Sequence, residues 1–142
     1  HDALPIYELK KEIHFTAVNP ENLFQTNCDI VSPCALGKAI NIKNRNQLKC
    51  AAIVGAANNQ LDSTETAKWL FNNKIVYSPD YLVNSGGVIA IAAEINKREN
   101  LIDQHLNEIS SRLESVLLES KENNIPTDFV AKRIALERIS NS

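Results

Sequence analysis

Two apolar runs in this chain end in small and amide-bearing residues, and this feature constrains the fold most. The run that ends in Gly55-Ala56-Ala57 is followed by Asn58-Asn59-Gln60, and Tyr81-Leu82-Val83 is followed by Asn84-Ser85-Gly86-Gly87. In α/β sheets, ligands bind beyond the carboxyl ends of the strands, where small residues allow close backbone approach. Amide side chains at such ends can fix a ligand's orientation. The pattern therefore predicts two neighbouring strand ends at one ligand-binding edge.

Strand and helix signals alternate along the first part of the chain. Strands are expected over 15–18, 29–32, 51–57 and 75–77, and helices after Pro5 and over 20–26, 36–42 and 63–73. This alternation favours right-handed βαβ units, hence an α/β fold with a parallel sheet. Further helices are expected over 88–97, over the apolar seam from 102 to 117, and from Thr127 to about Ile139 after the break at Pro126. The shift from α/β to all-α near residue 100 is the only candidate boundary.

Composition and charge exclude several classes of function. The 142 residues are enough for one domain with a core, and the net charge of −2 gives no electrostatic footprint for nucleic acid or an anionic membrane. The most apolar stretch, Val88 to Ala93, is too short to span a bilayer. Cys28, Cys34 and Cys50 have no C-x-x-C spacing, which predicts neither a disulfide framework nor a zinc site and favours a reducing, cytoplasmic compartment.

Two further absences bear on the extent of the chain. No G-x-G-x-x-G turn occurs, although this kind of sheet usually carries one before its first helix. The sequence also contains no methionine, including at position 1. We therefore expect the chain to be a piece of a longer protein.

Each candidate residue has a structural alternative. Gly86-Gly87 could simply serve a loop that needs positive φ, but the matching amides after the neighbouring run favour a ligand site. A buried free cysteine is favoured over a catalytic thiolate for Cys34, because no histidine lies near it in sequence. Asp2 could be a ribose-binding acid or a helix cap near Pro5.

Four blocks of the sequence resemble leucine dehydrogenases, within the family of Glu/Leu/Phe/Val dehydrogenases. They are Cys28-Asp29-Ile30-Val31-Ser32-Pro33-Cys34-Ala35-Leu36-Gly37, Ala57-Asn58-Asn59-Gln60-Leu61, the stretch from Ile75-Val76-Tyr77-Ser78-Pro79-Asp80-Tyr81 to Gly86-Gly87-Val88-Ile89, and Asn123-Asn124-Ile125-Pro126-Thr127 with Arg133 and Glu137-Arg138-Ile139. The blocks lie in the same order as in the family and cover nearly the whole chain.

The resemblance implies the latter part of a Rossmann NAD-binding domain over residues 1–99, followed by a C-terminal helical segment over 100–142. The implied enzyme activity is NAD-dependent oxidative deamination of a branched-chain L-amino acid to the 2-oxo acid and ammonia. By the same resemblance, Asp2 would bind the adenosine ribose, and Pro33, Cys34 and Ala35 would line the nicotinamide side. Asn59 and Asn84 would hold the nicotinamide ribose or carboxamide.

Val88 and Ile91 would face the substrate side chain, although by residue type alone both would more often pack in a core. The glycine-rich turn, the catalytic lysines and the catalytic aspartate of the family lie upstream of this sequence. No catalytic residue is therefore assigned here, and the chain alone is expected to be inactive.

An exposed sheet edge and the apolar helical seam predict a homo-oligomer. The expected partner is a small amino-acid substrate, with no nucleic acid and no membrane. The competing interpretation is a non-catalytic interaction or oligomerisation module that retains the fold and pairs through the 101–122 seam.

Overall fold

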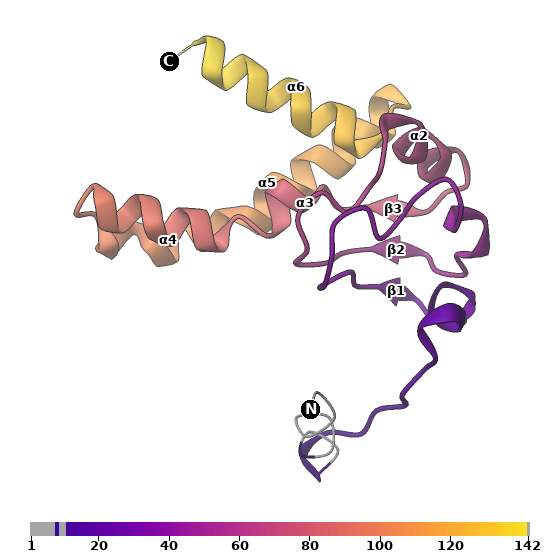
Figure 1. Ribbon diagram of the computed structural model, residues 1–142. Helices are drawn as coiled ribbons and strands as arrows, with labels where there is room; N and C mark the ends of the chain where they lie inside the picture. Colours follow the sequence, from indigo (N-terminus) through magenta and orange to yellow (C-terminus); the bar gives the residue numbers. More distant parts are fainter. Residues whose placement is uncertain (1–7, 9–10, 142) are drawn as a thin grey trace.

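The structure is a computed structural model that describes residue 8 and residues 11–141 (Figure 1). Asp2 and Pro5 lie outside the described residues. The elements are the short 3₁₀ helix η1 (Pro20–Gln25), β1 (Ile30–Val31), η2 (Arg45–Gln47), β2 (Ala52–Ile53), α2 (Thr64–Asn72), β3 (Val76–Tyr77), α3 (Asp80–Val83), α4 (Gly86–Ile95), η3 (Glu99–Leu101), α5 (Ile102–Asn123) and α6 (Thr127–Ser140).

The three strands form a parallel sheet in the order β1-β2-β3, which confirms the expected α/β class. Each strand is only two residues long, with Ile53 paired to Val31 on one side and to Tyr77 on the other. Helix α2 connects β2 to β3 and packs on the sheet with Leu70, which is fully buried against Ile53 and Tyr77. Ser63 caps this helix by accepting a hydrogen bond from the Thr66 N–H.

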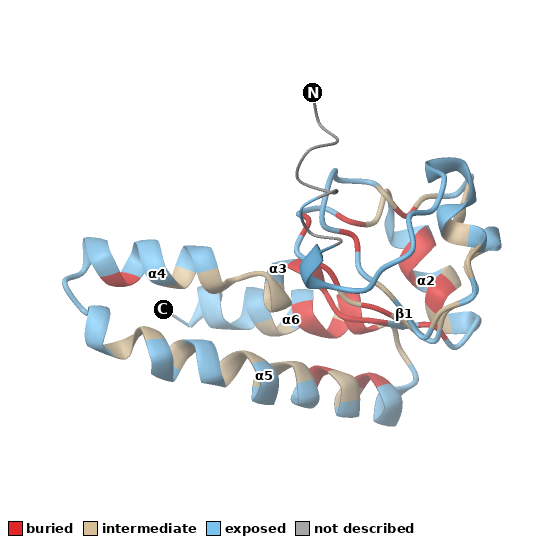
Figure 2. Ribbon diagram, turned by 90° about the horizontal axis from the view of Figure 1, so that it is seen from below, coloured by how far each residue is buried: buried red, intermediate tan, exposed pale blue. Residues whose placement is uncertain are grey.

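The second half of the chain is helical. Helices α4 and α5 pack against each other in an arm that extends away from the sheet. Helix α5 leads the chain back to the sheet, and α6 begins beside β3 and runs away from it to the C-terminus (Figure 1). Val116, Val130 and Ala131 form a second small core where α5 meets α6. Buried residues concentrate at the sheet and at this junction, while the far part of the helical arm is largely exposed (Figure 2).

The start of α6 is fastened to the sheet by hydrogen bonds. The Thr127 hydroxyl donates to the Tyr77 carbonyl at 2.6 Å, and the Tyr81 hydroxyl donates to the Asp128 carbonyl at 3.2 Å. Both bonds join residues about fifty positions apart, so the end of the chain belongs to the same packed unit as β3.

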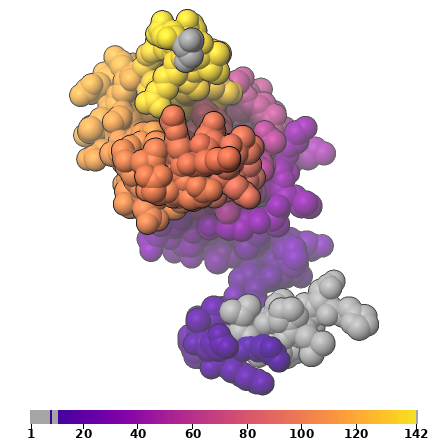
Figure 3. Space-filling model, turned by 90° about the vertical axis from the view of Figure 1, so that its left-hand side faces the viewer, coloured from indigo at the N-terminus to yellow at the C-terminus, as the bar shows by residue number. Residues whose placement is uncertain are grey.

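Two expected elements are wrong. Residues 14–19 form no strand and are exposed, because no neighbouring strand among the described residues pairs with them. In Figure 3 this indigo segment lies below the rest of the molecule. Residues 36–42 form no helix. Ile40 instead makes a parallel bridge with Leu61 and is fully buried, so a long-range backbone pairing overrides the local helical pattern.

The helix expected over 88–97 begins two residues earlier, at Gly86, and ends at Ile95. Within the described part of the chain, no helix is both long enough and apolar enough to cross a membrane.

Candidate functional site

The ends of β1 and β2 touch each other at the carboxyl edge of the sheet. The Ala57 N–H donates to the Pro33 carbonyl at 2.9 Å. A Cβ atom added to Gly55 would lie 2.2 Å from the Pro33 carbonyl oxygen, so only glycine allows this approach. The sequence predicts that small residues at this edge allow close approach of a ligand, whereas Gly55 allows a contact between two loops of the chain itself.

Asn84 connects the third chain segment to the same edge. Its side-chain nitrogen donates to the Asn58 side-chain oxygen at 2.7 Å and lies within 3.4 Å of the carbonyls of Ala56 and Ala57. The structure thus brings together Pro33, the 55–58 loop and Asn84. Asn58 follows β2 as expected, but Tyr81-Leu82-Val83 belongs to helix α3 rather than to a strand, so Asn84 reaches this edge from the end of a helix.

Cys34 is exposed, so the expectation of a buried free cysteine is wrong. Its Sγ lies 3.3 Å from the Ser32 hydroxyl oxygen. Hydrogen bonds from Ser32 and from the Ala56 backbone lower the pKa of the Cys34 thiol below its ordinary value. Ala35 follows it and is also exposed.

Asn59 has a different environment from Asn84. It adopts the left-handed conformation with φ of 53°, and its carbonyl accepts a 2.6 Å hydrogen bond from the Lys38 N–H. Its backbone therefore supports the 37–38 turn, while its exposed side chain is open to solvent.

Gln60 departs from the sequence expectation that it orients a ligand. It is fully buried, and its side-chain nitrogen donates to the carbonyls of Gly55 and Ala57. Asp80, which sequence reasoning missed, is 7% exposed and accepts a hydrogen bond from the Gln60 N–H. The only signal in the sequence is that Asp80 is a lone acid directly after Ser78-Pro79.

Val88 and Ile91 lie on α4 and are 72% and 59% exposed. They do not pack in a core of this chain, so that alternative is excluded among the described residues. Together with Ile95, 75% exposed, they form an apolar row on one side of α4.

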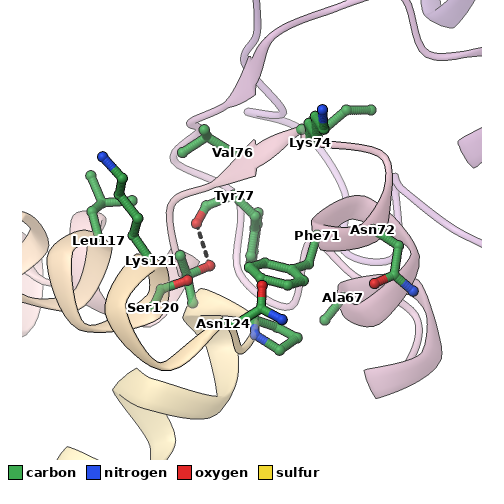
Figure 4. Close-up of a pocket in the computed structure, with 13 residues that line it drawn as sticks. Ala67, Phe71, Asn72, Lys74, Val76, Tyr77, Leu117, Ser120, Lys121 and Asn124 are labelled. Carbon is green, nitrogen blue, oxygen red and sulfur yellow. Dashed lines mark hydrogen bonds between the residues drawn. The ribbon is translucent and has the colours of Figure 1, made fainter.

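A hollow of about 650 Å³ lies elsewhere, between α2, β3 and the C-terminal half of α5 (Figure 4). Tyr77 and Phe71 lie side by side in the lining of this hollow. The dashed line in Figure 4 marks the hydrogen bond from the Thr127 hydroxyl to the Tyr77 carbonyl. Burial, together with the charge of Asp80, raises the pKa of the Tyr77 phenol. Among the residues described, no cluster of three His, Cys, Asp or Glu side chains could hold a metal ion.

Comparison with known proteins agrees with this architecture. Residues 2–140 match the family described as Glutamate/Leucine/Phenylalanine/Valine dehydrogenase. The chain is 42% identical over 126 residues to leucine dehydrogenase of Bacillus subtilis, covering 87% of this chain and 34% of that protein. It therefore spans about a third of the length of such curated relatives.

Two solved structures share the fold. The crystal structure of L-tryptophan dehydrogenase from Nostoc punctiforme superposes with a TM-score of 0.91 at 34% identity, covering 99% of this chain and 43% of that one. Hetero-hexameric glutamate dehydrogenase from Thermus thermophilus gives a TM-score of 0.73 at 20% identity, covering 99% of this chain and 35% of that one. The second likeness concerns the fold alone.

Proposed function

Since the chain belongs to the Glutamate/Leucine/Phenylalanine/Valine dehydrogenase family, we propose that it forms part of an NAD-dependent dehydrogenase acting on branched-chain L-amino acids. The products of the oxidative deamination would be the 2-oxo acid and ammonia. The observation that carries the proposal is the convergence of three segments, 33–35, 55–58 and 84–87, at the carboxyl edge of a parallel sheet.

The residues at this edge fit the nicotinamide end of NAD. Pro33, Cys34 and Ala35 would lie beside the ring, and Asn59 would supply a free amide. The side-chain nitrogen of Asn84 is already hydrogen-bonded within the protein. The side-chain oxygen of the same amide is therefore the atom left for a ligand. A Cβ added to Gly87 would meet nothing within 4 Å, which leaves the first turn of α4 open. When bound, NAD would accept a hydride from the substrate.

Asp2, proposed to bind the adenosine ribose, lies outside the described residues. Among the described residues of the proposed site there is no lysine or aspartate that could serve as the family's catalytic group, and hydride transfer requires both reactants at contact distance. We therefore propose that the rest of the site comes from parts of the protein beyond this chain.

Assembly into a homo-oligomer is part of the proposal. Leu136 and Ile139 on α6 leave large aliphatic side chains exposed. Ile30 on the edge strand β1 is also 58% exposed. Surfaces of this kind are usually covered by another chain or another part of the same protein.

The cofactor proposal predicts weak binding by this chain alone. The pyrophosphate of a dinucleotide gains much of its affinity from a glycine-rich turn and helix N-terminus, which this sequence lacks. Calorimetry should show NAD binding no tighter than about 1 mM, or about 4 kcal/mol. The full-length protein should bind NAD tightly and reduce it with leucine. A full-length protein without this activity would contradict the proposed function, and micromolar binding by the chain would contradict the missing phosphate site.

The substrate proposal predicts an effect of Val88→Ala in the full-length protein. An exposed Val88 beside Ile91 would give the substrate pocket a branched aliphatic wall, without a cation for a side-chain carboxylate. Removing two methyl groups should widen the pocket and shift the relative kcat/KM values for leucine, valine and phenylalanine by roughly 1–3 kcal/mol. Ile95→Ala, one turn further along the same row, is the control. Unchanged relative kcat/KM values for the three substrates in Val88→Ala would show that Val88 does not line the pocket.

A further inference from the structure

A single buried side chain, that of Gln60, holds two backbone carbonyls of the loop between β2 and α2. The Gln60 side-chain nitrogen donates to the Gly55 carbonyl at 2.6 Å and to the Ala57 carbonyl at 2.9 Å. An amide nitrogen has two hydrogens, so both are used within the protein. These bonds hold the two carbonyls towards the buried Gln60 side chain, while Ala56, which lies between Gly55 and Ala57, is exposed.

Gln60 is itself held from two sides. Its backbone N–H donates to the Asp80 carboxylate at 3.1 Å, and its carbonyl accepts from the Ile40 N–H at 3.0 Å. Asp80 is 7% exposed, and its N–H donates to the Tyr77 hydroxyl at 3.3 Å. The loop is therefore anchored through Gln60 to the residues that follow β3.

Burying the Gln60 side chain has an energetic cost, because one of its polar atoms is unpaired. The side-chain oxygen of Gln60, Oε1, is buried and has no hydrogen-bond partner among the described residues. An unpaired buried acceptor is unfavourable, so the value of an amide here lies in its two donors. A methionine would fill a similar space without the unpaired oxygen, but it could not hold the two carbonyls.

We propose that Gln60 is a positioning residue that fixes the 55–58 loop in the form that binds the nicotinamide end of the cofactor. The loop's other contacts point the same way, since Ala57 N–H reaches Pro33 and Asn84 bonds to Asn58. The cofactor half of this inference rests on the proposed function. The structural half, that Gln60 holds the loop, does not.

The structural half is tested on this chain by hydrogen exchange. In Gln60→Met the Ala57 amide, and the Lys38 amide that bonds to the Asn59 carbonyl, should exchange at least about tenfold faster, as expected when buried hydrogen bonds are lost. Ser120→Ala is the matched control, because Ser120 is 4% exposed and its hydroxyl donates to the Ile125 carbonyl far from the loop. It should leave both loop amides unchanged. Equal exchange of these amides in Gln60→Met and the wild type would overturn the proposal.

The cofactor half is tested on the full-length protein by steady-state kinetics. Gln60→Met should raise the KM for NAD about tenfold, the effect of one lost buried hydrogen bond, with a smaller change in kcat. Ser120→Ala, at a similar loss of thermal stability, should leave this KM unchanged. An equal rise in the KM for NAD in both variants would show that Gln60 only contributes to general stability, and it would overturn the inference.

A second variant keeps the proposal testable if the first one does not fold. If Gln60→Met does not fold, Gln60→Asn keeps the amide but shortens its reach, and it should give the same changes in exchange and KM. Normal values in Gln60→Asn would overturn the proposal. If the wild-type full-length protein fails to bind NAD, the proposed function and the cofactor half fail together, while the exchange experiment still decides whether Gln60 holds the loop.

Discussion

Replacing Gly55 with alanine is expected to destabilise the chain by about 3 kcal/mol, near the upper end for overpacking a buried site. The added Cβ would lie 2.2 Å from the Pro33 carbonyl oxygen and 2.6 Å from the Pro33 ring and nitrogen. Neither partner is a flexible side chain, so relief requires the ends of β1 and β2 to move apart. Urea denaturation followed by circular dichroism would measure the loss.

Gly87→Ala is the matched control for this substitution. Gly87 lies near the start of α4, none of the described glycines has a positive φ, and an added Cβ meets nothing within 4 Å. Alanine there should be neutral or stabilise the chain by about 0.5–1 kcal/mol, because it restricts the unfolded chain. A Gly55→Ala protein as stable as Gly87→Ala would show that the two strand ends are not in close contact.

The second large effect is expected at the centre of the sheet core. Leu70 on α2 is completely buried and packs with Ile53, Ile75 and Tyr77. Leu70→Ala removes that side chain from a cluster with few other members, and it should cost roughly 2–5 kcal/mol of unfolding free energy. The midpoint of thermal unfolding would fall accordingly, and it can be followed by calorimetry.

Leu136→Ala gives the comparison for Leu70→Ala. Leu136 also lies within a helix, α6, but is 65% exposed. Its truncation should change the unfolding free energy by no more than about 0.5 kcal/mol. If the two variants lose the same stability, α2 does not pack on the sheet as described.

The elements that sequence reasoning predicted well are those whose signals are local. The sequence predicts a helix over 63–73, and α2 forms over Thr64–Asn72, with Ser63 as its cap. The parallel sheet follows from the alternation of strands and helices, and all three strands form where expected, although each is shorter. Thr127 opens α6 directly after Pro126, as its sequence indicates.

The failures concern interactions with distant residues. The segment 36–42 has an apolar spacing compatible with a helix, but Ile40 pairs with Leu61, twenty-one positions away. Residues 15–18 have strand-forming side chains, yet a strand needs a neighbour, and none pairs with them among the described residues. Local pattern contains no information about either partner.

The candidate site was only partly accessible for the same reason. Asn58, Asn59 and Gln60 are adjacent amides that look equivalent in sequence, but the first two are exposed and the third is fully buried. Which amide turns inward depends on Asp80, twenty positions later, and on the carbonyls of the loop itself. Sequence reasoning therefore located the edge of the sheet correctly but could not separate the residues that build it from those free to meet a ligand.

The hydrogen bonds that join Thr127 to Tyr77 and Asp128 to Tyr81 have a consequence for folding during synthesis on the ribosome. Synthesis proceeds from the N-terminus at about 5–20 residues per second, and early segments fold as they emerge. The partners of Tyr77 and Tyr81 lie about fifty residues downstream. The outer strand of the sheet must therefore remain without its helical cover for some seconds after it has left the tunnel. During that interval its unpaired edge is open to wrong pairing and to binding by chaperones.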